Sequence, residues 1–250
     1  MTTEREKTTE TSYSSDAFPP TQWQLVHEAG SGQTEAAERA LSELCQTYWY
    51  PLYCFLRRSG LNPHDAEDRT QSFFQKLITE NLLQGANKDR GRLRSFLLTS
   101  VKNFIRDEWR KETAIKRGGH LKAVSFEQSE AENRYLLEPV DTDSPENLYD
   151  QAWAYTILER ALNHLRERYA EKGNAQRFSS LEPYLSAKDS KGSYRETARK
   201  MGMTEGAVRL AVFQLRKRYR IQLRREIAST VKNHEDIDRE LDYLKKIFEN

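Results

Sequence analysis

The chain has 250 residues, of which 37% are hydrophobic and 31% charged, and its formal net charge is +2. This length allows one or two small domains, and so polar a composition is typical of soluble proteins. No stretch approaches the roughly 20 apolar residues that cross a bilayer, and residues 1–16 lack the apolar segment of a secretory signal. We therefore expect a cytoplasmic protein with no membrane partner, in which residues 1–17 form a disordered leader.

The two cysteines, Cys45 and Cys54, are too few for a disulfide framework or a four-ligand zinc site. They are expected to be reduced, apolar, buried thiols. The sequence also has no glycine-rich phosphate loop of the Walker type. It therefore predicts neither a metal nor a cofactor.

Charge is strongly segregated along the chain. Residues 57–117 hold 14 Lys and Arg against 8 Asp and Glu, residues 121–160 hold 3 against 9, and residues 186–226 hold 12 against 4. Two basic blocks on either side of an acidic one suggest two modules that contact a single polyanion. The alternative is that each basic block is only a solvated helix face.

The first domain is expected over residues 18–119, and its periodic segments all predict helices. We place these helices from Thr21, from about Thr34 through Leu56 with a bend at Pro51, from Asn62 to about Leu83, and from Arg92 to about Arg117. A loop over residues 85–91 carries Lys88 and Arg90. No segment shows the alternation of a β-strand.

Residues 120–150 lose this periodicity, are acidic and contain two prolines, which predicts a flexible linker. Helices resume in a second domain over residues 151–226. Residues 227–250 predict an amphipathic helical extension, whose apolar stripe consists of Ile237, Leu241, Leu244 and Phe248. We expect it to pack on the second domain, with docking of a regulator as the alternative. The fold class is thus all-α, with two small helical domains joined by an acidic linker.

The second domain contains a pattern typical of a helix-turn-helix. Ser193–Glu196 has capping-box spacing, Gly202 supplies a turn, and Thr204 caps a further helix. That helix has a core-facing stripe of Val208, Val212 and Leu215. The second helix of such a unit enters the major groove of DNA. A helical hairpin with a solvated basic face is the alternative.

The other faces of this helix carry side chains suited to DNA. Arginine and glutamine can hydrogen-bond base edges, and phenylalanine and leucine can contact thymine methyl groups. The candidates are Arg209, Leu210, Phe213, Gln214 and Lys217. Residues 209–225 hold seven basic residues and no acidic one, which favours phosphate contacts.

The segment Ser193–Arg218 resembles region 4 of bacterial RNA polymerase sigma factors of the extracytoplasmic-function (ECF) class. The matching positions are Tyr194, Glu196, Ala198, Gly202, Thr204, Gly206 and Val208. The resemblance implies that this region binds the −35 promoter element. The implied contacts are Thr204, Arg209, Leu210, Phe213, Gln214 and Lys217.

The segment Asp65–Phe74 is similar to sigma region 2.2, in which Ala-Glu-Asp, Gln and Phe recur on one helix. The resemblance implies docking on the clamp helices of the polymerase β′ subunit through Asp65, Glu67, Asp68, Gln71 and Phe74. Arg69 stands where the family usually has an aliphatic residue. Glu67 and Asp68 could also form a catalytic or metal-binding pair or a solvated face, but no His- or Cys-rich ligand set accompanies them.

The segment Phe96–Arg110 is similar to sigma regions 2.3 and 2.4. The resemblance implies recognition of the −10 element by Lys88, Arg90, Arg92, Arg94, Asn103, Arg106 and Arg110. The loop over residues 85–91 would lie near a flipped base, for which its basic residues provide a positive approach. Asp107 either takes part or pairs with a neighbouring arginine. Trp109 either packs in the core or stacks on a base.

The resemblance covers residues 21–117 and 153–225 in the family's order. It implies a sigma factor that recognises promoter DNA and has no catalytic residues. The implied partners are core RNA polymerase, contacted through the β′ clamp helices and the β flap, and an anti-sigma factor as a regulatory partner. The alternatives are a standalone helix-turn-helix regulator and a nuclease that uses Glu67 and Asp68. We also expect the acidic linker to cover a basic DNA-binding face until polymerase displaces it.

Overall fold

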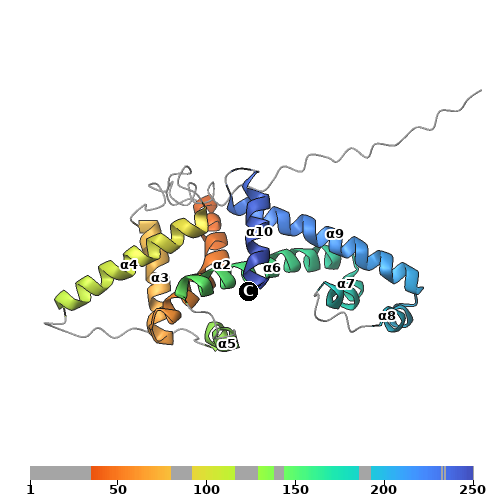
Figure 1. The fold of residues 1–250 in the computed structure, drawn as a ribbon, viewed down its shortest axis with the longest axis horizontal. Helices are drawn as coiled ribbons and strands as arrows, with labels where there is room; N and C mark the ends of the chain where they lie inside the picture. The colour runs from red at the N-terminus through yellow and green to blue at the C-terminus, as the bar shows by residue number, and fades with distance from the viewer. Residues whose placement is uncertain are drawn as a thin grey trace, which may run out of the picture.

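The computed structural model describes residues 35–79, 92–115, 129–137, 144–185, 193–231, 233 and 235–249. These residues form α-helices and one 3-10 turn, with no strand among them, which confirms the all-α prediction (Figure 1). None of their helices is long and apolar enough to cross a membrane. The leader and the loop with Lys88 and Arg90 lie outside the described residues.

The helices, in chain order, are α2 (Glu35–Arg58), α3 (Pro63–Thr79), α4 (Leu93–Ile115), α5 (Ser129–Leu137), α6 (Pro145–Glu171), α7 (Ala175–Leu181), η2 (Glu182–Tyr184), α8 (Tyr194–Met201), α9 (Glu205–Thr230) and α10 (Asp236–Glu249). α2, α3 and α4 lie at one end of the molecule, and α7 and α8 at the other (Figure 1). α6 and α9 run between the two ends.

Helix α2 continues through Pro51, where we predicted a bend. Proline removes one backbone hydrogen bond from a helix interior, because it has no N–H to donate to the residue four positions earlier. Here the buried side chains of Leu52, Tyr53 and Leu56 hold the second half of the helix against its neighbours. Tertiary packing therefore outweighs the local cost of the proline.

The first core contains residues from both the N-terminal and the C-terminal helices of the described chain. It contains buried residues of α2, α3 and α4, together with the first half of α6, the end of α9 and α10. Its largest fully buried side chains include Trp153, Tyr48 and Tyr149. Ser144 caps α6, accepting a hydrogen bond from the Asn147 amide at 3.1 Å. α6 thus begins inside the segment predicted as linker, and its first half belongs to the first core.

A second core lies among the end of α6, α7, α8 and the first half of α9. It is built around Leu165, Phe178, Tyr184, Val208 and Leu215. At about 1.5 Å per residue, α6 and α9 are each close to 40 Å long, long enough to reach both cores. The two cores are therefore connected by two continuous helices (Figure 1).

Acidic residues from the segment 120–150 contact the first basic block. On α5, Glu132 accepts hydrogen bonds from Arg57 at 2.7 Å and from the Tyr53 hydroxyl at 2.5 Å. The Arg57 bond is the main reason that the pKa of Glu132 lies below its ordinary value. Glu146, in the first turn of α6, pairs with Lys102 at 2.6 Å. These pairs fasten the acidic segment to α2 and α4.

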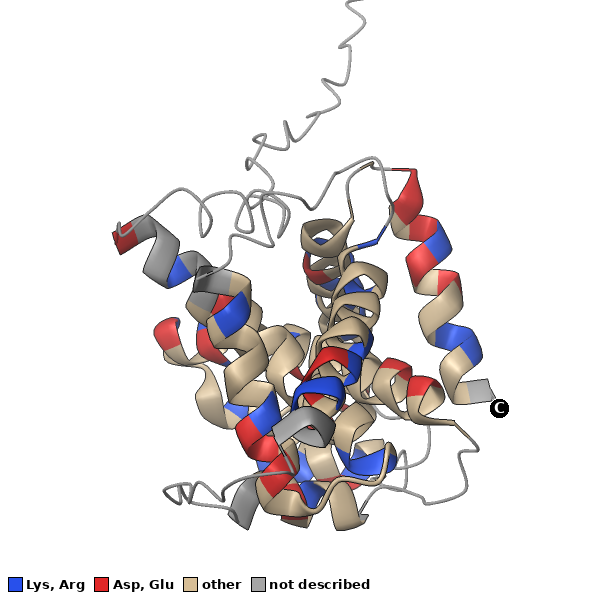
Figure 2. Cartoon of the chain, turned by 90° about the vertical axis from the view of Figure 1, so that its left-hand side faces the viewer, with Lys and Arg blue, Asp and Glu red and all other residues tan. Residues whose placement is uncertain are grey.

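Helix α10 packs on the first core, away from the helix-turn-helix. Ile237 and Leu244 are buried in that core, and Phe248 contacts the Tyr155 ring edge-to-face at 4.9 Å. The extension thus packs on its own chain, on α6 and the end of α9. Figure 2 shows α10 with acidic residues in its first turns and basic residues further along. Its inward-facing Glu240 is almost completely buried.

Candidate nucleic-acid interface

The helix-turn-helix consists of α8, a turn at Gly202 and the start of α9. Gly202 adopts a left-handed φ of 62°, and Met203 donates back to the Ala198 carbonyl at 2.9 Å. Thr204 caps α9 as predicted, its hydroxyl accepting from the Ala207 amide at 3.2 Å. A left-handed residue after the last helical turn reverses the chain sharply, so α9 leaves α8 at a fixed angle.

The predicted capping box of α8 is not formed. Ser193 is the N-cap, but its hydroxyl makes no capping hydrogen bond. The Glu196 amide instead donates to the Ser193 backbone carbonyl at 2.9 Å. The amide that a capping box would use is therefore already satisfied.

The two faces of α9 differ as the sequence predicted. Val208, Val212 and Leu215 are buried in the second core. On the opposite side Leu210 is 57% exposed and Phe213 65% exposed. Two neighbouring large apolar side chains in solvent, beside the exposed Gln214 and Lys217, indicate a contact surface for another molecule.

Arg209 lies at the edge of this surface and already has two contacts. Its guanidinium pairs with Glu205 at 2.7 Å and lies over the Tyr194 ring, 4.6 Å from the centroid. Tyr194 in turn stacks on Tyr184 at 4.8 Å. These contacts orient Arg209 at the start of α9, and a bond to DNA would replace the Glu205 carboxylate.

A second exposed polar surface follows α4. Asn103, Arg106 and Arg110 recur at three- and four-residue spacing, and Arg106 donates to the Asn103 side-chain oxygen at 2.8 Å. Trp109 is 51% exposed, so it is not a core residue. Asp107 lies 3.9 Å from Arg110, at the limit of an ion pair. An exposed tryptophan among cationic side chains is suited to stacking on an unpaired base.

Arg92 and Arg94 do not belong to this surface. The Arg94 side chain is buried at 7% exposure, pairs with Asp150 and Glu240, and lies 4.2 Å from the centre of the Tyr243 ring. Arg92 also pairs with Glu240. In this arrangement Arg94 is therefore inaccessible to DNA, contrary to the role that the resemblance implied. Glu240 lies 146 residues away from Arg94, so no local pattern could have indicated the pairing.

The acidic residues of α3 lie near the start of that helix. The Asn62 side chain caps it, accepting from the Asp65 amide at 2.9 Å, and donates to the Asp65 carboxylate at 2.7 Å. Glu67 and Asp68 are half-buried, and desolvation, followed by the charge of Asp68, raises the pKa of Glu67. His64 lies 3.1 Å from Asp68.

Gln71 is exposed on α3, whereas Phe74 is not. Phe74 is 5% exposed and packs edge-to-face on Phe73, so it supports the helix from within and cannot offer a direct contact to polymerase. Arg69, the departure from the family pattern, pairs with Glu108 at 2.8 Å and thereby ties α3 to α4.

Neither cysteine is a surface nucleophile or a metal ligand in the described part of the chain. Cys54 is buried, and burial raises the pKa of the half-buried Cys45 to about 11. Within the described ranges, no three His, Cys, Asp or Glu side chains converge to hold a metal ion. Glu67 and Asp68, with His64 beside Asp68, do not form such a group.

The chain was compared with family models, curated proteins and solved structures. None of the three comparisons gives a match.

Proposed function

We propose that this protein is a sigma factor of the ECF class, which directs core RNA polymerase to promoters. The observation that carries the proposal is the outer face of α9, where exposed Leu210 and Phe213 lie beside Arg209, Gln214 and Lys217. That helix follows α8 after a turn at the left-handed Gly202, the order of elements in a helix-turn-helix. The motifs on α3 and α4 support the polymerase and −10 assignments.

In this function the two surfaces have different tasks. The outer face of α9 enters the major groove at the −35 element, where Arg209 and Gln214 bond base edges and Phe213 contacts thymine methyl groups. The α4 surface holds the −10 strand, with Trp109 stacking on a base and Arg106 and Arg110 near phosphates. Bases held in this way offset the cost of unpairing, so no nucleotide hydrolysis is needed.

The acidic face of α3 is assigned to the β′ clamp helices. Glu67, Asp68 and Gln71 lie within about one helical turn and would pair with basic and polar groups of a partner helix. The β flap and an anti-sigma factor are further partners in this proposal. Cytoplasmic localisation also belongs to the proposal, since polymerase and promoter are found there.

The decisive experiment is binding of the purified chain to bacterial core polymerase by size-exclusion chromatography. A Glu67→Lys, Asp68→Lys variant should lose co-migration, because it reverses the charge of the docking face. A Glu235→Lys, Asp242→Lys variant makes the same charge change at exposed sites near the C-terminus and should still bind. Equal binding by both variants would refute the docking surface, and no binding by the folded parent would refute the sigma assignment.

A standalone helix-turn-helix regulator is the second candidate. It is favoured by the observation that α8, the turn and the first half of α9 pack, together with α7 and the end of α6, around a second core. Retention on promoter-like DNA without any binding to polymerase would support it. An Arg209→Ala, Phe213→Ala variant should lose DNA binding under either candidate, so polymerase binding alone separates the two.

The acidic segment has a role in the same proposal. Glu146 pairs with Lys102, the neighbour of Asn103 on α4, and so places negative charge beside the proposed −10 surface. A Glu146→Gln variant should therefore bind single-stranded −10 DNA more tightly than the parent. Unchanged affinity at low salt would argue against a covering role for this segment.

A further inference from the structure

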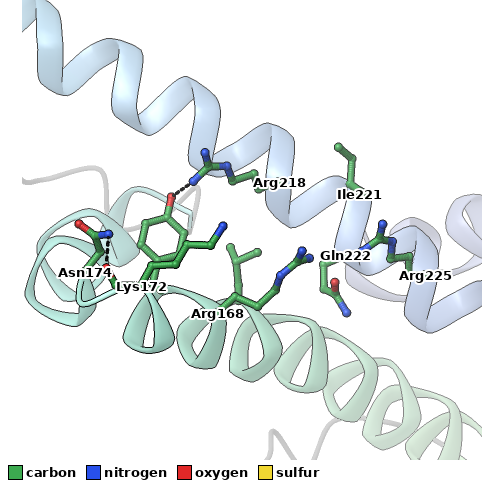
Figure 3. Close-up of a pocket in the computed structure, with 9 residues that line it drawn as sticks. Arg168, Lys172, Asn174, Arg218, Ile221, Gln222 and Arg225 are labelled. Atoms are coloured by element: carbon green, nitrogen blue, oxygen red, sulfur yellow. Dashed lines mark hydrogen bonds between the residues drawn. The ribbon is translucent and has the colours of Figure 1, made fainter. Parts of the chain in front are cut away.

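A pocket of about 220 Å³ lies between the last turns of α6 and the middle of α9 (Figure 3). Arg168 extends into it from α6 and Lys172 from the C-cap of that helix, and Arg218 and Arg225 line it from α9. Tyr169 and Ile221 form the aromatic and apolar parts of the pocket lining. The sequence showed the basic run on α9, but the basic residues of α6 had no part in any predicted site.

The pocket concentrates positive charge without an acidic residue in its lining. Arg168, in the last turn of α6, and Lys172, the C-cap of that helix, are four residues apart, a spacing at which like charges repel. Both side chains are exposed, and in the described part of the chain no carboxylate pairs with either. Such a cluster lowers its electrostatic free energy when an anion enters.

Arg218 is held in place for such a contact. It donates to the Tyr169 hydroxyl at 2.9 Å, and its guanidinium lies 5.5 Å from the centre of the Tyr169 ring. Tyr169 is itself fixed against Phe178 at 5.3 Å. A planar guanidinium uses only one of its five N–H donors in this bond, so others remain to bind oxygen atoms of an anion.

We propose that this pocket binds the phosphate groups of a small phosphorylated ligand. Several phosphate oxygens can be bonded at once by guanidinium and ammonium groups from two facing helices. The volume is below the roughly 300–1,000 Å³ of pockets that enclose drug-sized molecules, so it matches a diphosphate or the phosphate tail of a nucleotide. Tyr169 and Ile221 lie where the remainder of a nucleotide would begin.

The site is distinct from the proposed DNA surface. Arg218 directly follows Lys217 of that surface, but its side chain turns toward α6 and bonds to Tyr169 (Figure 3). None of the residues that line the pocket is assigned to promoter recognition or to polymerase docking. Failure of the function proposed above would therefore leave this inference intact.

The test is calorimetric titration of the full chain with inorganic pyrophosphate and, separately, with ATP. An Arg168→Ala, Lys172→Ala variant should bind at least about tenfold more weakly, because two charge-assisted bonds are lost. An Arg195→Ala, Lys200→Ala variant removes the same two charges from exposed positions on α8 and should bind as the parent does. Circular dichroism would verify that both variants fold.

Equal affinity for pyrophosphate and ATP would assign the site to the phosphate groups alone, and tighter ATP binding would extend it to the nucleoside. Both results support the proposal. The absence of saturable binding by the parent, or equal weakening in both variants, would overturn it. So would displacement of pyrophosphate by short duplex DNA through Arg168 and Lys172, since the pocket would then belong to a nucleic-acid interface.

Discussion

Glu240 on α10 is the most deeply buried charged residue in the part of the chain that the structure describes. Its side chain is 1% exposed and pairs with Arg92 and Arg94. Arg94 also pairs with Asp150, which accepts a hydrogen bond from the Tyr243 hydroxyl at 2.5 Å. Buried charges are tolerated only when paired, and removal of one partner leaves the other desolvated and unpaired.

We expect Glu240→Ala to lower the free energy of unfolding by about 3 kcal/mol, because Arg94 stays buried with only Asp150 as a counter-charge. Urea denaturation measures this change. The matched control is Asp242→Ala on the same helix, where an exposed carboxylate pairs only with exposed Lys245 and the loss should be below about 0.5 kcal/mol. Equal effects of the two substitutions would contradict the structural role of Glu240.

A second buried carboxylate, Glu226 on α9, interacts with a titratable partner. His164 Nδ1 lies 2.6 Å from it, and Arg160 and Gln222 also contact it. The hydrogen bond to Glu226 raises the pKa of His164 above 6.5, although partial burial acts in the other direction. Burial acts to raise the pKa of Glu226, but the bonds from His164 and Gln222 outweigh it and lower that pKa.

A histidine whose pKa is higher in the folded state than in the unfolded state stabilises the fold when it is protonated. This contribution is complete at pH values below the ordinary pKa of 6.5, and it is lost as the pH rises through the pKa of the folded state. We therefore expect the Tm of the parent to exceed that of His164→Gln at about pH 6, and this difference to be smaller at about pH 8.5. Paired thermal melts at the two pH values measure it. Arg160 and Glu167 are the other charged groups that act on His164. A constant difference would show that the imidazolium charge does not contribute.

At the scale of elements, the turn between α8 and α9 requires a residue that readily adopts a left-handed backbone conformation at position 202. A Cβ at Gly202 would meet no atom within 4 Å, yet φ is +62°. Gly206 also has room for a Cβ, but it lies in the first turns of α9, where alanine favours the helix. The two glycines thus differ in conformation and not in available space.

Gly202→Ala should therefore destabilise the protein by about 1–2 kcal/mol, the cost of a left-handed conformation for an L-residue. Gly206→Ala should leave stability unchanged or raise it by up to about 1 kcal/mol. Chemical denaturation of both variants measures the difference. A stabilised Gly202→Ala would mean that the turn does not adopt this conformation in solution.

At the scale of the whole molecule, α6 and α9 belong to both cores. Trp153 and Leu165 lie on α6 in different cores, as Ile227 and Leu215 do on α9. Helix formation is cooperative along a continuous segment, so loss of one core removes support from the other. This arrangement differs from two bodies joined only by a flexible linker.

We expect Leu215→Ala, in the second core, to cost about 2–5 kcal/mol. The loss should also lower the unfolding midpoint followed by tryptophan fluorescence, since Trp49 and Trp153 lie in or against the first core. Far-UV circular dichroism provides the second probe, and the two midpoints should coincide. An unshifted fluorescence transition would show that the cores unfold independently.

The sequence by itself determined what depends on neighbouring residues. The helical class, the cap at Thr204, the turn at Gly202 and the buried stripe of Val208 and Leu215 were all predicted, because capping, left-handed glycine and helical periodicity act within a few residues. The exposed face of α9 followed from the same periodicity. The capping box predicted at Ser193 is not formed, because the Ser193 backbone carbonyl already accepts the hydrogen bond of the Glu196 amide.

Only the tertiary structure decided which distant groups meet. The pairing of Glu240 with Arg94, of Glu132 with Arg57, and the convergence of Arg168 with Arg218 each join segments far apart in the chain. Such contacts depend on which helix faces pack together, and composition shows only that a charge is available. That is why the resemblance to sigma factors implied a DNA contact for Arg94 and a partner contact for Phe74, while the fold buries both. A side chain's chemistry is local, but its burial and its counter-charge are properties of the packed whole.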